Sequence, residues 1–396
     1  MRRLVSIVLA LFLGSLALSE ARGLPRYPFV HLEENHLRFP GGPSPEYREF
    51  YLKLDTLVHS GRGDVRILHV GGSHVQAGTW SERLRRRFLS LRYGMDGGRG
   101  LVFPFSAAGT NTPTGYNSSY TGNWTASKCL HPDTRTGLTG MTVTAADTSA
   151  RVVIDLMPRD NRPHQVRYSF NRVDVMGYGD MEPVLLLHGK DTIRGVGARG
   201  FWHFDLPCYT DWFQMAFYRP GGSFTLKGLY LDRSDGGLTF NEAGVNGAAT
   251  SSWLRCDDWE QDLRRVMPDL VIFSIGINDI QGTDFDAARF KENYRSLIRK
   301  VRRVNPRCAI LFTTNNDSWK RRDINPFTGD IVLAFRELAQ EYHAAYWDLY
   351  AIMGGYGSMA TWQEAGLAQS DKIHFTSEGY KLLGDLLFEA IMERPR

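Results

Sequence analysis

The alternation of two hydrophobic patterns is the feature that most constrains how this chain folds. Short apolar runs rich in branched residues, such as residues 65–70, predict buried strands, and stretches with helical spacing, such as residues 285–304, predict amphipathic helices. Strands that alternate with helices favour a parallel sheet, because each connection must cross over the sheet. The sequence therefore predicts a three-layer α/β/α fold with helices on both faces of a parallel sheet.

A long stretch of different character interrupts this alternation. Between residues 97 and 233 the helical periodicity is lost, and short candidate strands punctuated by Gly, Pro, Asn and Asp take its place. These candidate strands are residues 151–157, 165–176, 183–189, 201–206, 211–218 and 223–231. Many short strands with turn signals predict an all-β sandwich. Since the α/β pattern resumes afterwards, we expect residues 61–96 and 234–396 to form one discontinuous domain around the inserted sandwich.

The N-terminus has the layout of a secretory signal peptide. Two arginines after Met1 precede an apolar run over residues 5–18, which is too short to span a bilayer comfortably. Small residues at Ser19 and Ala21 supply a cleavage site, so we expect residues 1–21 to be removed and the protein to be periplasmic or extracellular. An uncleaved anchor is the alternative, and no stable membrane span is expected after cleavage. Residues 22–60 follow as an N-terminal extension with a helix that begins near Ser44.

The composition excludes several classes of protein. Apolar residues make up 42% and charged residues 23% of the chain, which is an ordinary globular mixture. The net charge of +4 is small and scattered. The densest basic run, Arg83–Arg87, has helical spacing and is predicted to form a solvated helix face, so no nucleic-acid partner is expected.

The four cysteines point to oxidation rather than to a metal. An exported chain can oxidise them, and Cys129, Cys208, Cys256 and Cys308 allow three complete pairings that spacing alone does not distinguish. Cys129 and Cys208 lie in the same predicted insert, which favours that pair, while four buried free thiols are the alternative. The sequence has no CxxC or HExxH motif, so neither a metal nor another cofactor is expected.

Polar residues with complementary chemistry follow the predicted strands. In open α/β sheets, ligands bind beyond the carboxyl ends of the strands. The residues placed there, or just before the last helix, are Ser73, Gly244, Gly247, Asn278, Asp371 and His374. Each alone has an ordinary structural explanation, such as a glycine turn or a helix cap. Their joint placement supplies a nucleophile, a base, an orienting acid and hydrogen-bond donors, which is what acyl transfer requires.

Each residue has a specific expected role. Ser73 lies on a glycine turn that enters a helix and is the candidate nucleophile, with His374 as its general base. Asp371 lies three residues before His374 and is expected to orient its ring. The expected oxyanion donors are the backbone amides of Ser73 and Gly247 and the side-chain amide of Asn278. Gly244 is the alternative to Gly247.

Four sequence blocks in order now identify a resemblance. The blocks are Gly71–His74, Gly244–Thr250, Gly276–Asp279 and Asp371–His374. Together they resemble the SGNH (GDSL-type) serine hydrolases, which implies a flavodoxin-like catalytic domain and a Ser73, His374 and Asp371 triad without cofactor. One departure is Gly72, which stands where that family usually has aspartate. The resemblance covers the α/β part and not the insert.

The insert adds a second resemblance, to the exported peptidoglycan O-acetylesterases. It implies an esterase that removes O-acetyl groups from a polysaccharide, with peptidoglycan as the expected substrate and partner. Acetylxylan-type esterases and O-acetyltransferases remain alternatives, as does a non-enzymatic carbohydrate-binding protein on a degenerate hydrolase fold. Aromatic residues of the insert, including Trp124, Trp202 and Trp212, are candidates for sugar stacking or for the core. His69 is expected to be a packed, hydrogen-bonded residue of a strand, and His74 to cap the turn or to line the pocket.

Overall fold

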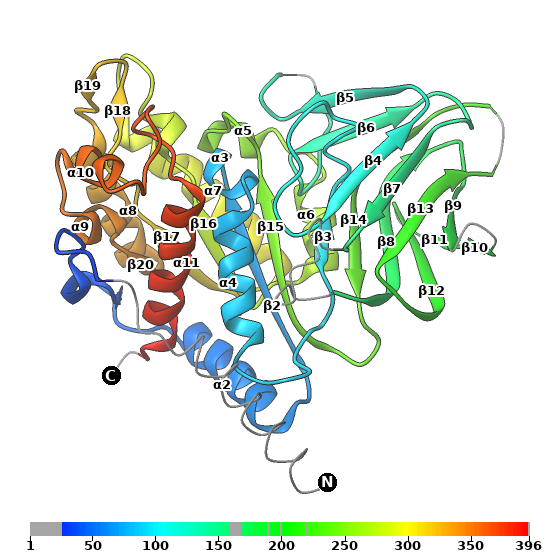
Figure 1. Ribbon diagram of the computed structural model, residues 1–396, viewed down its shortest axis with the longest axis horizontal. Coiled ribbons are helices and arrows are strands. Elements are labelled where there is room, and N and C mark those ends of the chain that lie inside the picture. Colours follow the sequence, from blue (N-terminus) through cyan, green and yellow to red (C-terminus); the bar gives the residue numbers. More distant parts are fainter. Residues whose placement is uncertain are drawn as a thin grey trace, which may run out of the picture.

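A computed structural model describes most of the 396-residue chain. The described residues are 26–132, 134–157, 168–187, 191–198, 200–218 and 221–394. The predicted signal peptide, residues 1–21, lies outside them. Figure 1 shows a helix-covered sheet on one side of the molecule and antiparallel strands on the other. Within the described ranges, no helix combines the length and apolar character that crossing a bilayer requires.

A six-stranded sheet forms the centre of the α/β part, in the order β1-β20-β17-β16-β2-β15. Its strands are β1 (Leu37–Arg38), β2 (Asp64–Gly71), β15 (Gly237–Gly244), β16 (Leu270–Ser274), β17 (Ala309–Thr313) and β20 (Ala345–Trp347). The strands run parallel except for β1, which the sequence does not predict and which pairs antiparallel with β20 at the edge. The predicted fold class is confirmed.

Helices cover both faces of this sheet, as side chains that alternate along β2 require (Figure 1). Ile67 belongs to the apolar cluster of one face, with residues of α2 (Pro45–Ser60), α4 (Thr79–Leu89) and α11 (Ser377–Met392). Leu68 belongs to the cluster of the other face, with residues of α6 (Trp259–Val266), α7 (Ala287–Val304) and α8 (Thr328–Tyr342). The shorter helices are α3 (Ser73–Gln76), α5 (Thr250–Leu254), α9 (Leu349–Met353) and α10 (Ser358–Glu364), with the 3₁₀ turns η1 (Leu32–Glu34) and η2 (Ile277–Asp279).

Two predicted elements end earlier than their patterns indicate. The helix expected from Ser73 onwards breaks into α3 and α4 at Gly78, which has φ of +79° and lies so close to the insert that a Cβ would stand 2.4 Å from the Thr114 amide. The apolar and aromatic pattern of residues 344–351 predicts a strand, but the strand in the structure ends at Trp347. There Asp348 accepts a 3.1 Å hydrogen bond from the Ala351 amide and starts α9. Both breaks come from local contacts that hydrophobic spacing does not report.

Two antiparallel sheets pack together beside the α/β part. One has the order β10-β9-β13-β7-β4, and the other β11-β12-β8-β14-β6-β5 with β3 on β14. Their strands are β3 (Gly100–Val102), β4 (Asn117–Thr121), β5 (Trp124–Lys128), β6 (Met141–Ala145), β7 (Arg151–Asp155), β8 (Phe170–Gly179), β9 (Pro183–Leu187), β10 (Asp191–Arg194), β11 (Val196–Ala198), β12 (Phe201–Thr210), β13 (Trp212–Phe217) and β14 (Phe224–Asp232). A separate hairpin joins β18 (Trp319–Lys320) to β19 (Asp323–Ile324).

The antiparallel strands all fall between two strands that are neighbours in the central sheet. β2 precedes them and β15 follows them, and these two pair in parallel from Asp64↔Gly237 to Gly71↔Gly244. The chain segments on either side of the sandwich therefore build one sheet. Strands β3 to β6, β10 and β11 are additions to those that the sequence predicts.

The basic run Arg83–Arg87 is not a solvated helix face, so that prediction is wrong. The Arg85 side chain is 1% exposed and donates hydrogen bonds of 2.7 and 3.1 Å to the carbonyl oxygen of Phe240. Arg83 and Arg87 pair with Asp385 of α11 at 2.7 Å. Buried and half-buried carboxylates therefore balance the positive charges of this run.

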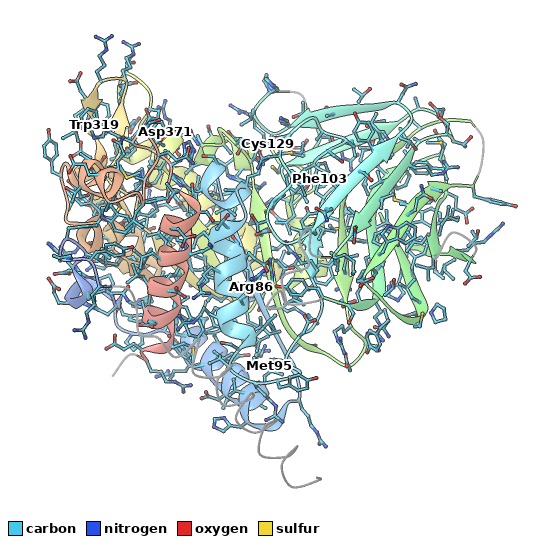
Figure 2. All side chains as sticks on the ribbon, in the orientation of Figure 1. Arg86, Met95, Phe103, Cys129, Trp319 and Asp371 are labelled. Atoms are coloured by element: carbon cyan, nitrogen blue, oxygen red, sulfur yellow. The ribbon has the colours of Figure 1, made fainter. Side chains whose placement is uncertain are left out.

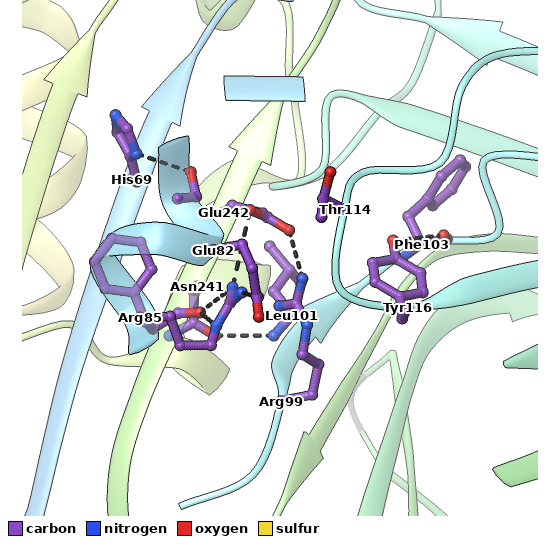
Figure 3. A network of polar contacts seen from close by, with 12 residues as sticks. His69, Glu82, Arg85, Arg99, Leu101, Phe103, Thr114, Tyr116, Asn241 and Glu242 are labelled. Atoms are coloured by element: carbon purple, nitrogen blue, oxygen red, sulfur yellow. Dashed lines mark hydrogen bonds and ion pairs between the residues drawn. The ribbon is translucent and has the colours of Figure 1, made fainter. Parts of the chain in front are cut away.

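A buried ionic network joins α4, β15 and the insert (Figure 3). Arg85 forms ion pairs with Glu82 and Glu242, and Arg99 pairs with the other carboxylate oxygen of Glu242. Tyr168 of the insert donates a 3.1 Å hydrogen bond to Glu82. Burial would raise the pKa of Glu82, but Arg85 and Arg99 more than offset it and the pKa lies below its usual value. These charges hold the sandwich against the α/β part.

We expect Arg99→Met to destabilise the protein by about 3–5 kcal/mol, because it leaves Glu242 buried with only the longer contact to Arg85. Urea unfolding followed by circular dichroism measures the change. The matched control is Lys381→Ala, which breaks an exposed ion pair with Glu378 and should leave the unfolding midpoint in place. An Arg99→Met protein as stable as the wild type would show that the network does not support the junction.

Candidate active site

Ser73 stands where β2 ends and α3 begins, at the carboxyl edge of the sheet. The turn before it is tight, since a Cβ on Gly71 would lie 2.3 Å from Cγ2 of Val75. Gly72 occupies the N-cap position, so the amide of Ser73 is among the first-turn amides that have no intrahelical acceptor. The sequence folds in this way because glycines allow the strand to enter a helix within two residues.

Ser73, His374 and Asp371 form a continuous hydrogen-bonded chain. Ser73 Oγ lies 2.7 Å from His374 Nε2, and His374 Nδ1 lies 2.7 Å from Asp371 Oδ2. The carboxylate only accepts, so Nδ1 carries the ring proton and Nε2 is left to accept from the Ser73 hydroxyl. The side chains of His374 and Asp371 are 31% and 43% exposed, so solvent reaches the base.

The carboxylate of Asp371 is held in its charged form. Its Oδ1 accepts hydrogen bonds from the amides of Ile373 and His374 at 2.9 and 3.0 Å. Burial would raise the pKa of Asp371, but the hydrogen bonds from the amide and ring of His374 and from Ile373 lower it below its usual value. The acid is therefore ionised at neutral pH and able to orient an imidazolium.

The Asn278 amide and the turn that carries Gly247 lie against Gly72, the residue before Ser73. Asn278 Nδ2 donates to the Ala248 carbonyl at 3.0 Å and lies 3.2 Å from where a Cβ of Gly72 would stand. Gly247 has φ of +82° in a turn closed by a 3.0 Å hydrogen bond from the Ala248 amide to the Val245 carbonyl, and this bond leaves the Gly247 amide available.

The structure separates the two candidate glycines. Gly244 ends β15 so close to α3 that a Cβ would lie 2.3 Å from the Gln76 amide, whereas a Cβ on Gly247 would meet only Leu130, at 3.8 Å. Gly244 is thus a close-packing residue, and Gly247 remains the candidate donor. Asp279 fixes the end of the turn that carries Gly247. Its carboxylate accepts hydrogen bonds from the amide and hydroxyl of Thr250, the latter at 2.6 Å.

Gln76 connects the insert to the turn of residues 245–248, which we call the oxyanion turn. The sequence does not predict this role. The side-chain oxygen of Gln76 accepts from the Asn246 amide at 2.6 Å. Its side-chain nitrogen donates to Thr110 and Asn111 of the insert at 3.0 and 3.1 Å. Gln76 is buried, so this bridge is fixed. No signal beyond its place two residues after the first block marks it in the sequence.

A buried polar loop after β17 holds the segment that carries Asp371 and His374. Asn316 donates a 3.2 Å hydrogen bond to the Ile373 carbonyl, and the Trp319 amide donates to the Lys372 carbonyl at 3.0 Å. The Lys372 ammonium lies 3.6 Å from the centre of the Trp319 ring, and Lys372 itself has φ of +53°. The sequence signal for this support is the run of polar residues over 313–318, directly after a buried strand.

The two other histidines near the site are buried. His69 lies between the hydroxyls of Ser81 and Ser274 at 2.9 and 2.8 Å, as a packed and hydrogen-bonded strand residue. His74 shares a 2.8 Å hydrogen bond with the Tyr380 hydroxyl and packs beside the ring of His374. Burial lowers the pKa of His69 to about 3, and burial together with His374 lowers the pKa of His74 to about 3. Both rings are therefore neutral.

Because these histidines are buried and neutral, we expect the stability of the folded protein to decrease as the pH decreases. His69 has a pKa of about 3 in the folded protein and about 6.5 when unfolded, so between these values only the unfolded chain binds the proton. Stability is therefore lost as pH falls below 6.5. We expect His69→Gln to reduce the pH dependence of the unfolding free energy near pH 5 by about 1.4 kcal/mol per pH unit. Urea unfolding at pH 7, 6 and 5 measures it, and equal slopes for both proteins would contradict the assignment.

One family model and several solved structures are similar to this chain or to parts of it. Residues 220–382 match the model of the GDSL-like Lipase/Acylhydrolase family, a range that contains the second, third and fourth blocks but not Ser73. No match was found among curated proteins. The fold is similar to a solved peptidoglycan O-acetylesterase, with a TM-score of 0.73, 22% identity, and coverage of 90% of this chain and 98% of that chain.

Two further solved structures each match 39% of this chain. An acetylxylan esterase from Geobacillus stearothermophilus is 20% identical over 39% of this chain and 73% of its own, with a TM-score of 0.31. A lipase/acylhydrolase from Enterococcus faecalis is 23% identical over 39% of this chain and 76% of its own, with a TM-score of 0.32. Residues 220–382 thus resemble the GDSL-like lipases and acylhydrolases, and the fold of the chain is similar to that of a solved peptidoglycan O-acetylesterase.

Proposed function

We propose that this protein is an exported serine esterase that removes O-acetyl groups from peptidoglycan through an acyl-enzyme on Ser73. The observation that carries the proposal is the solvent-open chain of hydrogen bonds from Ser73 through His374 to Asp371. Two features support the substrate. The fold, insert included, is similar to a peptidoglycan O-acetylesterase, and the N-terminal residues have the layout of a signal peptide.

The geometry performs the reaction in two steps. Ser73 Oγ attacks the acetyl carbonyl carbon while His374 Nε2 takes the hydroxyl proton and Asp371 stabilises the resulting imidazolium. His374 then gives the proton to the departing sugar oxygen, which leaves an acetyl group on Ser73. His374 next deprotonates a water molecule that reaches its exposed side, and the hydroxide attacks the acyl carbon. The bond from the acyl carbon to Ser73 Oγ breaks, His374 returns the proton to Ser73 Oγ, and acetate leaves.

The negative charge that develops on the carbonyl oxygen needs donors that are already in place. An amide nitrogen such as Asn278 Nδ2 carries two hydrogens. One binds the Ala248 carbonyl and fixes the side chain, and the other is available to the oxyanion. The amides of Ser73 and Gly247 supply the remaining donors in this scheme.

The insert supplies a second wall of the site. Thr110 and Asn111 meet the oxyanion turn through Gln76, and Asn111 accepts a 2.9 Å hydrogen bond from the exposed Asn246 side chain. We therefore place the sugar chain along this polar rim. Trp124, Trp202 and Trp212 are only partly buried, so part of each ring remains open to solvent for stacking on a sugar.

The first test is acetate release from O-acetylated peptidoglycan and from acetylated xylan. We expect faster release from peptidoglycan, and we expect Ser73→Ala and His374→Ala to lower turnover by several orders of magnitude without unfolding the protein. The matched control is Ser90→Ala, an exposed serine at the end of α4, which should keep full activity. A sulfonyl fluoride should label Ser73. A fully active Ser73→Ala protein would overturn the nucleophile, and preference for xylan or transfer of acetyl to a sugar without acetate release would overturn the reaction.

The second test separates the oxyanion role of Asn278 from a structural one. We expect Asn278→Ala to lower kcat about a hundredfold with little change in KM, as for a donor used mainly in the transition state. The matched control is Asn293→Ala. It removes another amide that bonds the same region, at 2.9 Å to Thr250, and should lower stability while kcat is retained. An Asn278→Ala protein that is less stable but fully active would remove Asn278 from the oxyanion hole.

A further inference from the structure

Two buried thiols from distant parts of the chain meet at the junction between the insert and the α/β part. Cys129 directly follows β5 in the insert, and Cys256 lies in the turn between α5 and α6. Both residues are 0% exposed, and the neighbouring Cys256 thiol is the largest single influence on the pKa of the Cys129 thiol, which it raises. Figure 2 labels Cys129 between the sandwich and the helices.

Hydrogen bonds hold the segment that contains Cys129 against the segment that contains Cys256. Arg255 donates hydrogen bonds of 3.3 and 3.2 Å to the carbonyl oxygens of Cys129 and Leu130, and the Cys129 amide donates to the Gly140 carbonyl at 2.9 Å. On the other side, the Cys256 thiol lies 3.9 Å from the Ser252 carbonyl. The segments that carry the two buried thiols are therefore held against each other.

The remaining cysteines have different surroundings. Cys208 is exposed on β12, and Cys308 is buried beside β17 with its thiol 3.4 Å from the Ala309 carbonyl. The pairing of Cys129 with Cys208, which their common place in the insert favours, is not formed in the structure, where all four cysteines are free and Cys208 is exposed whereas Cys129 is buried.

We propose that Cys129 and Cys256 are joined by a disulfide when the chain folds in an oxidising compartment. The inference rests on the export part of the proposed function and not on the catalytic activity. The oxidant is the disulfide of a thiol–disulfide exchange partner, such as an oxidoreductase or oxidised glutathione. Two exchange steps transfer two electrons and two protons from the cysteines, so that one S–S bond forms between them, the oxidant's S–S bond breaks and two thiols leave on the oxidant.

The folded structure dictates when the bond forms. The neighbouring Cys256 thiol and burial raise the pKa of the Cys129 thiol well above its usual range. Since the thiolate is the reactive form, exchange is slow once the junction has closed. The bond must form while the insert is docking, before the two thiols are buried.

The cross-link would act on the site through Leu130. This residue follows Cys129, and its Cδ1 is the one atom within 4 Å of the position that a Cβ of Gly247 would occupy. A bond from Cys129 to Cys256 therefore holds the insert against the turn that carries the candidate oxyanion donor. The cross-link closes a loop of more than a hundred residues, so it also restricts the unfolded chain strongly.

Peptide mapping tests the pairing directly. The full chain is refolded in a buffer of reduced and oxidised glutathione, free thiols are alkylated under denaturing conditions, and trypsin cleaves after Lys128 and Arg255. We expect peptides 129–135 and 256–264 to appear joined without reductant and separate with it, while Cys208 and Cys308 are alkylated. Four alkylated cysteines, or a link from Cys129 to another cysteine, would overturn the proposal. Neither result depends on activity, so failure here is distinct from failure of the proposed esterase function.

Thermal unfolding supplies the second measurement. We expect a reductant to lower the Tm of the oxidised wild type by about 5 °C or more. The Cys129→Ala/Cys256→Ala protein should have a lower Tm that no longer responds to the reductant. Cys208→Ala is the matched control and should respond like the wild type. A wild-type Tm that is unchanged by the reductant would contradict the cross-link, and the peptide map decides the question if the double variant fails to fold.

Discussion

The parallel pairing of β2 with β15 is the constraint on which the rest of the structure depends. Eight consecutive residue pairs join these strands although the whole sandwich lies between them in sequence. Loop-closure entropy grows slowly with length, so a long insert is tolerated once its two ends are paired. The same pairing brings the turn after β2, which carries Ser73, beside the turn after β15, which carries Gly247. The pairing of β2 with β15 therefore determines both the position of the site and the point at which the insert leaves the α/β part.

The insert is packed into the α/β part rather than attached at its surface. Apolar residues of both sheets of the sandwich and of the helices on one face of the central sheet form one continuous cluster. The buried charges of Arg85, Arg99, Glu82 and Glu242 add polar contacts whose geometry must be satisfied, since an unpaired charge there is costly. Gln76 continues the junction up to the oxyanion turn. A displacement of the insert would therefore also displace residues of the site, because these contacts are rigid.

The sequence predicts the α/β part well because its signals are local. β15 and α11 span the same residues as their patterns, and each chemical block directly follows a strand or precedes a helix. It does not predict β4 and β5, which are polar strands of exposed and half-buried residues without apolar alternation. It also misses the burial of Arg85, because a basic run with helical spacing looks the same whether solvent or carboxylates face it. The sequence does not predict the pairing of the cysteines either, since their spacing allows every combination.

Gly72 shows how the chain departs from the pattern of the GDSL-type hydrolases that it resembles while keeping the arrangement of the site. Its φ of −92° lies outside the left-handed region that favours glycine. Space is what matters: a Cβ there would stand 3.2 Å from the Asn278 amide nitrogen and 3.5 Å from the Ala248 carbonyl. Glycine lets Asn278 lie against the turn and keep its bond to Ala248. Because Ser73, His374 and Asp371 make none of these contacts, the departure affects the surroundings of the oxyanion donor and leaves the hydrogen bonds of the triad unchanged.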